Sequence, residues 1–293
     1  MRLSESRPVT SLRPVVASDF EAIHQSLLRT LDPRIPPARW RGLFSWGWDN
    51  PEDHVGYGLF NANGTPVGFV ATLYSRQSVG GQIHRFCNLS SWVVADGHGS
   101  SSLRLIMPVL ARRDLTITNL TPIPSVTAIF RKLGFTSLES AVVVFGPRSL
   151  ATPSRLRGTT LSTIRPGMEI NAGEWESRRI EDHLATCHQW WLQAGSQHCH
   201  IAFTIGRRRG LRTLRIHSIS HPRVFLDNLG TVHRRAVISF GAVYLECDAR
   251  LLASTGTGPG RLFPLANPRL FRSTQLVAQD VSNLYSELPV LRL

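Results

Sequence analysis

The residues best suited to do chemistry lie between Trp92 and Arg104, in the stretch "WVVADGHGSSSLR". Its glycines and serines follow an apolar run, and from Leu103 to Leu110 apolar residues recur at helical spacing. Small residues between a strand and a helix leave successive backbone N–H groups free to face an anion, and the helix N-terminus adds its dipole. The stretch therefore predicts a phosphate-binding loop. A tight turn into a core helix is the alternative.

The charge of the chain favours an anionic partner of some kind. Its 293 residues include 33 basic and 20 acidic ones, a formal net charge of +13. Nearly all the basic residues are arginines, which pair well with phosphate and carboxylate groups. The run "GRRRG", Gly206 to Gly210, has no interleaved aromatic residues of the kind that bind single strands. We expect a solvated hairpin tip there, and nucleic acid is not the expected partner.

Histidines and cysteines crowd into one part of the second half, where a metal site has to be considered. Their spacing fits no common zinc motif, so no metal is expected. The four scattered cysteines are expected to be reduced and buried. The crowded residues are His183, Cys187, His188, His198, Cys199 and His200.

Composition places the chain among ordinary globular proteins, with 42% hydrophobic and 18% charged residues. No apolar run reaches the ~18 residues of a membrane span, and the first residues lack the apolar core of a secretory signal. We therefore expect a cytoplasmic protein without a membrane partner. The oligomeric state is left open.

Helical and strand patterns alternate through the first half, which predicts an α/β fold with helices on both faces of a sheet. Ser18 and Glu21 have the spacing of a capping box at the start of the first helix. The elements expected, in order, are a helix at 18–31, a strand pair around Asn63-Gly64, a strand at 84–94, a helix from Ser100 containing Pro108, a short strand at 114–123, a helix at 124–133 ended by Gly134, and a strand at 141–146.

The second half repeats this order, which predicts a tandem arrangement of two similar units. We expect a helix at 181–195, a hairpin at 198–220, a helix at 222–239 and a strand at 242–252, followed by an apolar tail that docks on the body. The expected domains are 1–148, a linker at 149–166, and a second, degenerate domain at 167–293.

This order and three of its segments resemble the GNAT superfamily of acyl-CoA-dependent N-acyltransferases. "RPVVASDFEAI" looks like the family's first strand and helix, and "AIFRKLGF" looks like its last helix. Other segments are similar to those of uncharacterised bacterial tandem acyltransferase-like proteins. The resemblance implies a mixed central sheet flanked by helices, with acetyl-CoA or another acyl-CoA as co-substrate. Its pyrophosphate would bind the loop residues Trp92, Val93, Val94, Gly99, Ser100, Ser101, Ser102, Leu103 and Arg104.

The loop departs from the family's pattern at the positions of its small residues. Ser102 stands where the family has its first required glycine, and Arg104 takes the second small position. Because the donors are backbone amides, a serine is compatible with binding, and a guanidinium can itself pair with phosphate. Phe130 replaces the tyrosine that often protonates the departing thiolate, and it has no proton to give.

The resemblance also implies a base that takes a proton from the acceptor, but no Asp or Glu lies on the central strands. The candidates are Tyr74, His84 and Asn119, or a water molecule. The backbone N–H near Val94 would polarise the thioester carbonyl. The expected function is transfer of an acetyl or longer acyl group to an amine or hydroxyl of a small-molecule acceptor. The alternative is an inactive GNAT-like module that binds a ligand or a protein.

Overall fold

The computed structural model describes residues 10–153 and 158–293, which form two compact units. The first unit holds residues 10–46 and 50–119, and the second holds 47–49 and 120–293. The units thus divide at 119/120, before the helix and strand that precede the expected linker. The assignment of GNAT-like domains to 1–148 and 167–293 stays a prediction, and residues 154–157 of the expected linker lie outside the described residues.

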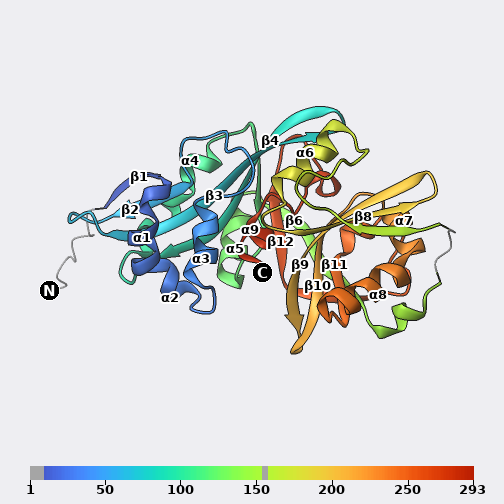
Figure 1. Ribbon diagram of the computed structural model, residues 1–293. Helices are drawn as coiled ribbons and strands as arrows, with labels where there is room; N and C mark the ends of the chain where they lie inside the picture. The colour runs from blue at the N-terminus through green and yellow to red at the C-terminus, as the bar shows by residue number, and fades with distance from the viewer. Residues whose placement is uncertain (1–9, 154–157) are drawn as a thin grey trace. The chain divides into compact units, whose positions relative to one another are not determined.

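The first unit contains a five-stranded mixed sheet in chain order (Figure 1). Its first three pairings are antiparallel, and the last, between β4 and β5, is parallel. A parallel pairing requires a crossover, and helical segments between residues 99 and 110 supply it. The strands are β1 (Ser11–Val15), β2 (Gly56–Phe60), β3 (Pro66–Val79), β4 (Gln82–Val94) and β5 (Leu115–Asn119).

The first helical region begins earlier than the capping pattern predicts. The capping carboxylate is that of Asp19, which accepts a hydrogen bond from the N–H of Val16 at 3.0 Å, and the predicted pair Ser18 and Glu21 does not make this contact. A π turn then rotates the buried face, which leaves Leu31 42% exposed. The segments before β2 are η1 (Ala17–Asp19), α1 (Phe20–Ile23), η2 (His24–Leu28), α2 (Arg29–Leu31), α3 (Pro37–Trp40) and η3 (Arg41–Leu43).

The crossover between β4 and β5 is not the single helix expected from Ser100. It consists of a 3₁₀ segment, η4 (Gly99–Leu105), and a separate short helix, α4 (Met107–Leu110). Pro108 lies in the first turn of α4, where its missing N–H leaves no helical bond unmade. The helical region therefore breaks before Pro108 instead of running through it.

In the second unit seven strands pair side by side, and among the described residues of this unit the β10–β11 pairing is parallel and the other pairings are antiparallel. Its strand order is β12-β6-β11-β10-β9-β8-β7. Helices α7 and α8 lie beside strands β9 and β11, in the middle of this strand order (Figure 1). The elements are α5 (Pro124–Lys132), β6 (Thr136–Phe145), η5 (Pro147–Ala151), β7 (Thr160–Thr163), α6 (Glu174–Asp182), β8 (His188–Ala194), β9 (Gln197–Arg208), β10 (Leu211–Ile219), α7 (Pro222–Asp227), α8 (Leu229–Phe240), β11 (Tyr244–Asp248), η6 (Ala249–Leu252), β12 (Arg261–Arg272), η7 (Ala278–Asp280) and α9 (Glu287–Leu291).

The helix expected at 181–195 is wrong, because this segment ends helix α6 and then forms strand β8. Residues 189–192 are all buried. A continuous buried run is compatible with a strand covered on both faces and equally with a helix segment that is buried all round. Length and the adjacent tryptophans, Trp190 and Trp191, are the features that favour the strand.

Part of the second unit repeats the strand pairing of the first. Strands β7–β11 repeat the pairing of β1–β5: three antiparallel neighbours, then one parallel neighbour across a helical crossover. The helix expected at 222–239 is divided into α7 and α8, and this crossover buries Phe225, Leu229, Val232 and Ala236. The β9–β10 turn also forms as expected, with positive φ at Arg209 (50°) and Gly210 (82°).

The C-terminal tail docks in the second unit through buried polar contacts as well as apolar ones. Asp248 accepts a hydrogen bond from Asn283 Nδ2 at 2.7 Å and forms an ion pair with Arg269 at 3.0 Å. Arg250 donates to Asn283 Oδ1 at 2.5 Å. These contacts compensate the buried charges and fix the tail in one position.

Within the described residues, no helix is long and apolar enough to cross a membrane.

The core of the second unit predicts sensitivity to acid. Burial lowers the pKa of His183, His200 and His217 to about 3, so these rings are neutral in the folded protein. In the unfolded chain they bind protons below about pH 6.5. Stability is therefore fully present above pH 6.5 and is lost between about pH 6.5 and pH 3, by roughly 1.4 kcal/mol per histidine per pH unit.

We predict that the urea midpoint falls clearly between pH 7.5 and pH 5.5, and that His217→Gln reduces this pH dependence. His217 Nε2 contacts Thr204 Oγ1 at 2.9 Å, a partner that an amide can also use. Equal midpoints at the two pH values in the unmodified protein would contradict the assignment of neutral buried histidines.

Candidate functional site

The edge of β4 that faces β5 is paired along only part of its length. The parallel pairing runs from Arg85–Leu115 to Asn88–Thr118, and β4 then continues to Val94 without a strand partner on that side among the described residues. Asn119 bridges the start of the opening, because its Nδ2 donates to the Leu89 carbonyl at 3.0 Å. The two strands thus separate and leave backbone groups of β4 available to a ligand.

A bulge in β4 lies within this unpaired stretch. Phe69 pairs with Val93 and Ala71 pairs with Ser90, so two residues of β4 oppose the single Val70 of β3. Ser91 takes up the extra length with a φ of +53°, a conformation that is rare for a serine. No sequence signal marks this position, since bulges with positive φ usually carry glycine.

After the bulge, the backbone N–H of Val94 points to the open edge. The N–H of Ala95 donates to Val67 of β3 at 2.8 Å. Because N–H groups of successive strand residues point to opposite edges, the N–H of Val94 faces away from β3. The donor expected from the resemblance therefore faces the edge of β4 that β5 leaves unpaired.

The loop that follows leaves backbone amides exposed. Gly97 has a φ of +82°, and a Cβ added at Gly97 or Gly99 meets no atom within 4 Å. The amides of Gly99 and Ser100 precede the first bonded donor of η4, the N–H of Ser101, and have no acceptor among the described residues. This is a small set of anion donors, without the aligned dipole of a full α-helix.

Two side chains hold the loop in place. Trp92 Nε1 donates to the Ser102 carbonyl at 3.1 Å, which ties η4 back to β4. Arg104 donates to the Thr10 hydroxyl at 2.9 Å and to the Thr10 carbonyl at 3.2 Å. The Arg104 guanidinium therefore anchors the loop to the segment before β1. Its hydrogen bonds to Thr10 hold it away from the role of a phosphate ligand. Only the backbone of Arg104 belongs to the candidate loop.

The expected catalytic side chains do not converge on Val94. Tyr74 is 1% exposed and pairs with Cys87 in the middle of the β3–β4 ladder. Burial raises its pKa further above the usual value of a phenol, so it is not a base near neutral pH. His84 lies near the opposite end of β4, about ten residues or roughly 30 Å of strand from Val94.

Asn119 is the one candidate near the open edge. Its amide nitrogen bonds Leu89, and its Oδ1 has no hydrogen-bond partner among the described residues. A carboxamide does not take up a proton at neutral pH, but this oxygen can accept a hydrogen bond from a bound ligand. We therefore treat Asn119 as a positioning group.

The carboxylates nearest the other end of β4 are already paired. Glu52 accepts from Arg85 at 2.5 Å and from Arg112 at 2.8 Å, and Asp114 pairs with the same two arginines. The Arg112 guanidinium lowers the pKa of Asp114 below its usual value. This four-residue network is a structural feature and does not supply a base.

Phe130 of α5 occupies the position at which the family often has a tyrosine. Its side chain is fully buried and packs on Phe135, with ring centroids 4.5 Å apart. Gly134 ends the helix region with a φ of +84°, as the sequence predicts. Phe130 therefore supplies no proton donor.

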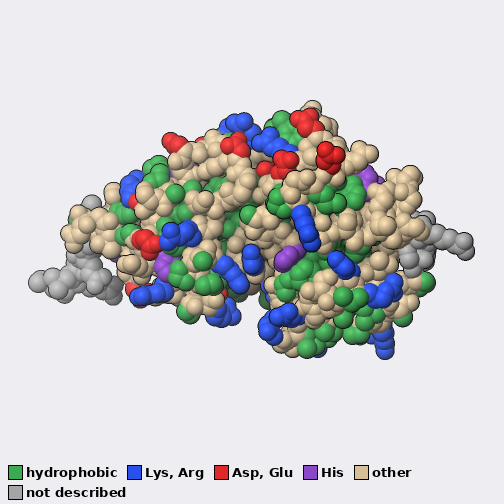
Figure 2. Space-filling view, viewed as in Figure 1, with side chains coloured by type: hydrophobic (Ala, Val, Ile, Leu, Met, Phe, Trp, Pro, Cys, Tyr) green, Lys and Arg blue, Asp and Glu red, His purple; other side chains and the backbone are tan. Residues whose placement is uncertain are grey.

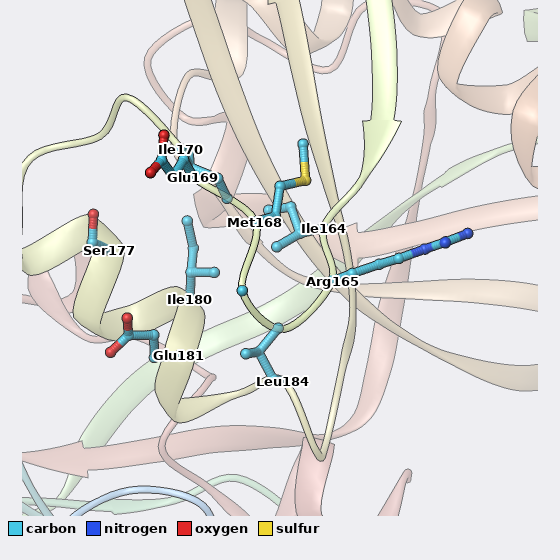
Figure 3. Close-up of a pocket in the computed structure, with 10 residues that line it drawn as sticks. Ile164, Arg165, Met168, Glu169, Ile170, Ser177, Ile180, Glu181 and Leu184 are labelled. Atoms are coloured by element: carbon cyan, nitrogen blue, oxygen red, sulfur yellow. The ribbon is translucent and has the colours of Figure 1, made fainter.

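The second unit has a pocket of about 340 Å³ between α6 and the segment 164–170 (Figure 3). Its lining is mixed: apolar side chains lie beside the hydroxyl of Ser177 and the carboxylates of Glu169 and Glu181, whereas the side chain of Arg165 points away from the other lining residues. Acidic side chains also gather over α6 in Figure 2. Such a lining suits a ligand with an apolar body and a positive charge.

The crowded histidines and cysteines do not form a metal site in the part of the chain that the structure describes. All four cysteines are buried and free, as expected. Burial raises the pKa of Cys187 and Cys199 to about 12, so both stay protonated thiols. His198 instead stacks on Trp191, with ring centroids 4.4 Å apart.

Comparisons with known proteins support the fold. No protein-family model matches the sequence, and no curated protein matches it significantly. A GCN5-related N-acetyltransferase from Anabaena variabilis matches with a TM-score of 0.57 and 12% identity, over 90% of this chain and 72% of that one. The corresponding enzyme from Kribbella flavida gives 0.57 and 14%, over 90% and 71%. Eis1 from Mycobacterium abscessus gives 0.50 and 12%, over 90% and 73%. The chain therefore has the GNAT fold, a mixed sheet flanked by helices.

We predict that Trp92→Phe loosens η4 without unfolding the protein. The change removes the indole N–H that donates to the Ser102 carbonyl, a loss of about 1 kcal/mol, together with part of the ring volume. Hydrogen exchange of the η4 amides should then accelerate by about 5-fold. Trp175→Phe on α6 is the matched control and should leave these amides unchanged. Equal exchange in the two variants would show that the tether does not order the loop.

Proposed function

We propose that this protein is an acyl-CoA-dependent acyltransferase that moves an acetyl or longer acyl group to a small-molecule acceptor. The observation that carries the proposal is the open edge of β4, where the N–H of Val94 lies just before a loop with exposed amides. The GNAT fold of the chain supports the same assignment. The acyl-CoA pyrophosphate would bind the amides of Gly99 and Ser100, and its thioester would lie along β4.

The chemistry would be a direct transfer. The acceptor nitrogen or oxygen attacks the thioester carbon while the Val94 N–H donates to the carbonyl oxygen, on which negative charge develops. The carbon–sulfur bond then breaks, and the coenzyme leaves as a thiolate. The acceptor's proton passes to water, and water protonates the thiolate, because Phe130 has no proton to give. Rate enhancement would come mainly from positioning the two substrates.

The pocket of the second unit supports an amine as the acceptor class. Glu169 and Glu181 lie beside its apolar side chains, in a chain whose net charge is otherwise strongly positive. A pair of carboxylates favours a protonated amine over a neutral hydroxyl compound. The second unit would then bind the acceptor.

A catalytically inactive binding module is the second candidate. Phe130 at the acid position favours it, and so does the Arg104 side chain bonded to Thr10. Both candidates keep the fold, and both can retain a ligand at the open edge of β4. They differ in whether bound acyl-CoA is turned over.

We predict that acetyl-CoA or a longer acyl-CoA binds the protein with micromolar affinity in calorimetric titration. Ser102→Glu should weaken binding by at least about 10-fold, because a carboxylate next to the loop amides repels the pyrophosphate. Ser102→Ala, which keeps the backbone donors, should bind like the unmodified protein.

Release of free thiol in the presence of an amine library would establish the acyltransferase, and binding without thiol release would favour the inactive module. No binding of either acyl chain length would contradict both candidates at this loop. An equal loss of acyl-CoA affinity in Ser102→Ala and Ser102→Glu would show that the Ser102 hydroxyl, and not the backbone, holds the anion.

A further inference from the structure

A second cavity in the second unit carries positive charge without a counterion. Its volume is about 330 Å³, within the range of small-ligand sites. Three arginines line it, Arg148, Arg209 and Arg261, together with the rings of Tyr244 and Phe263. The described part of the chain contains no carboxylate paired with any of the three arginines.

Strand register explains the floor of this cavity. Val144 of β6 pairs with Arg261 of β12 on one side and with Glu246 of β11 on the other. Because every second strand residue faces the same side, Phe263 lies on the face of Arg261, and Tyr244 lies on the face of Glu246. Two aromatic rings and one guanidinium therefore share one face of the sheet.

The walls come from two turns. Arg148 belongs to η5, directly after β6, and Arg209 belongs to the β9–β10 turn. That turn has two left-handed residues, Arg209 and Gly210, which gives it the tight geometry of a two-residue hairpin. The run of arginines expected to be a solvated tip thus contributes a wall residue to a cavity.

The nearest carboxylate is already neutralised. Glu246 accepts from Arg208 at 2.7 Å, and the Arg208 guanidinium also lies 4.6 Å from the centre of the Phe263 ring. The remaining three arginines present planar, permanently charged groups that match the oxygens of a phosphate. The rings offer a surface on which a planar base can stack.

We propose that this cavity binds a nucleoside phosphate, with the phosphates on the arginines and the base against Tyr244 and Phe263. The cavity is open to solvent, and its volume of about 330 Å³ fits one small molecule. This site lies wholly in the second unit and is independent of the acyl-CoA loop on β4.

Calorimetric titration of ADP into the full-length protein tests the proposal. We expect one ADP per chain at the cavity, with an affinity that falls as salt rises. Arg261→Gln and Arg209→Gln should each weaken binding by at least about 10-fold, since each loses a charged phosphate contact. Arg235→Gln, an exposed residue of α8 outside the cavity, removes the same charge and should change the affinity by less than about 2-fold.

ADP shares its diphosphate with acyl-CoA, so the two sites must be separated. Ser102→Glu should bind ADP as the unmodified protein does, and Tyr244→Leu should weaken ADP binding while leaving binding of inorganic pyrophosphate intact. Three results would each overturn the proposal: no saturable binding of ADP, equal losses of ADP affinity in Arg235→Gln and Arg261→Gln, or a loss of ADP affinity in Ser102→Glu alone. Tighter binding of a 12-nucleotide single strand than of ADP would overturn it in favour of a nucleic-acid surface.

Discussion

The short parallel pairing between β4 and β5 is the constraint on which the candidate site depends. It holds four residue pairs and stops at Asn88 and Thr118, although β4 continues for six more residues. A backbone edge that has lost its partner strand must satisfy its donors elsewhere. The Asn119 side chain satisfies one carbonyl, and the donors beyond it stay available to a ligand. The bulge at Ser91 then sets which donor faces the opening.

Much of the fold could be predicted from local patterns, and its irregular parts could not. The β9–β10 turn, the buried face of α8 and the strand β4 follow from turn residues and periodicity. The Ser102 region was correctly placed between a strand and a helical segment, but its 3₁₀ geometry was not foreseen. Pro108 signalled that break, since a proline fits the first turn of a new helix better than the middle of a long one.

The site shows the same division between local and long-range information. The candidate loop can be proposed from the sequence because glycines and serines are local signals. The bulge, the Asn119–Leu89 bond and the anchoring of Arg104 on Thr10 depend on partners far away in the sequence. Strand β8 was mistaken for a helix because a run buried on both faces carries no period.

The strand pairing that the two units share does not imply shared chemistry. The crossover of the first unit begins with small residues and exposed amides, whereas α7–α8 of the second unit is an ordinary buried helix pair. The second unit instead has one pocket with carboxylates and one cavity with arginines. The same pairing pattern thus carries loops of different composition in the two units.

The central claim is that acyl-CoA lies along the open edge of β4 with its carbonyl at Val94. Hydrogen exchange of the Val94 amide, measured by NMR with and without saturating acetyl-CoA, tests it most directly. We predict that this amide exchanges readily in the free protein and becomes protected with acetyl-CoA, together with the amides of Gly99 and Ser100. Saturation by acetyl-CoA with no change at Val94 would contradict the claim and place the ligand elsewhere.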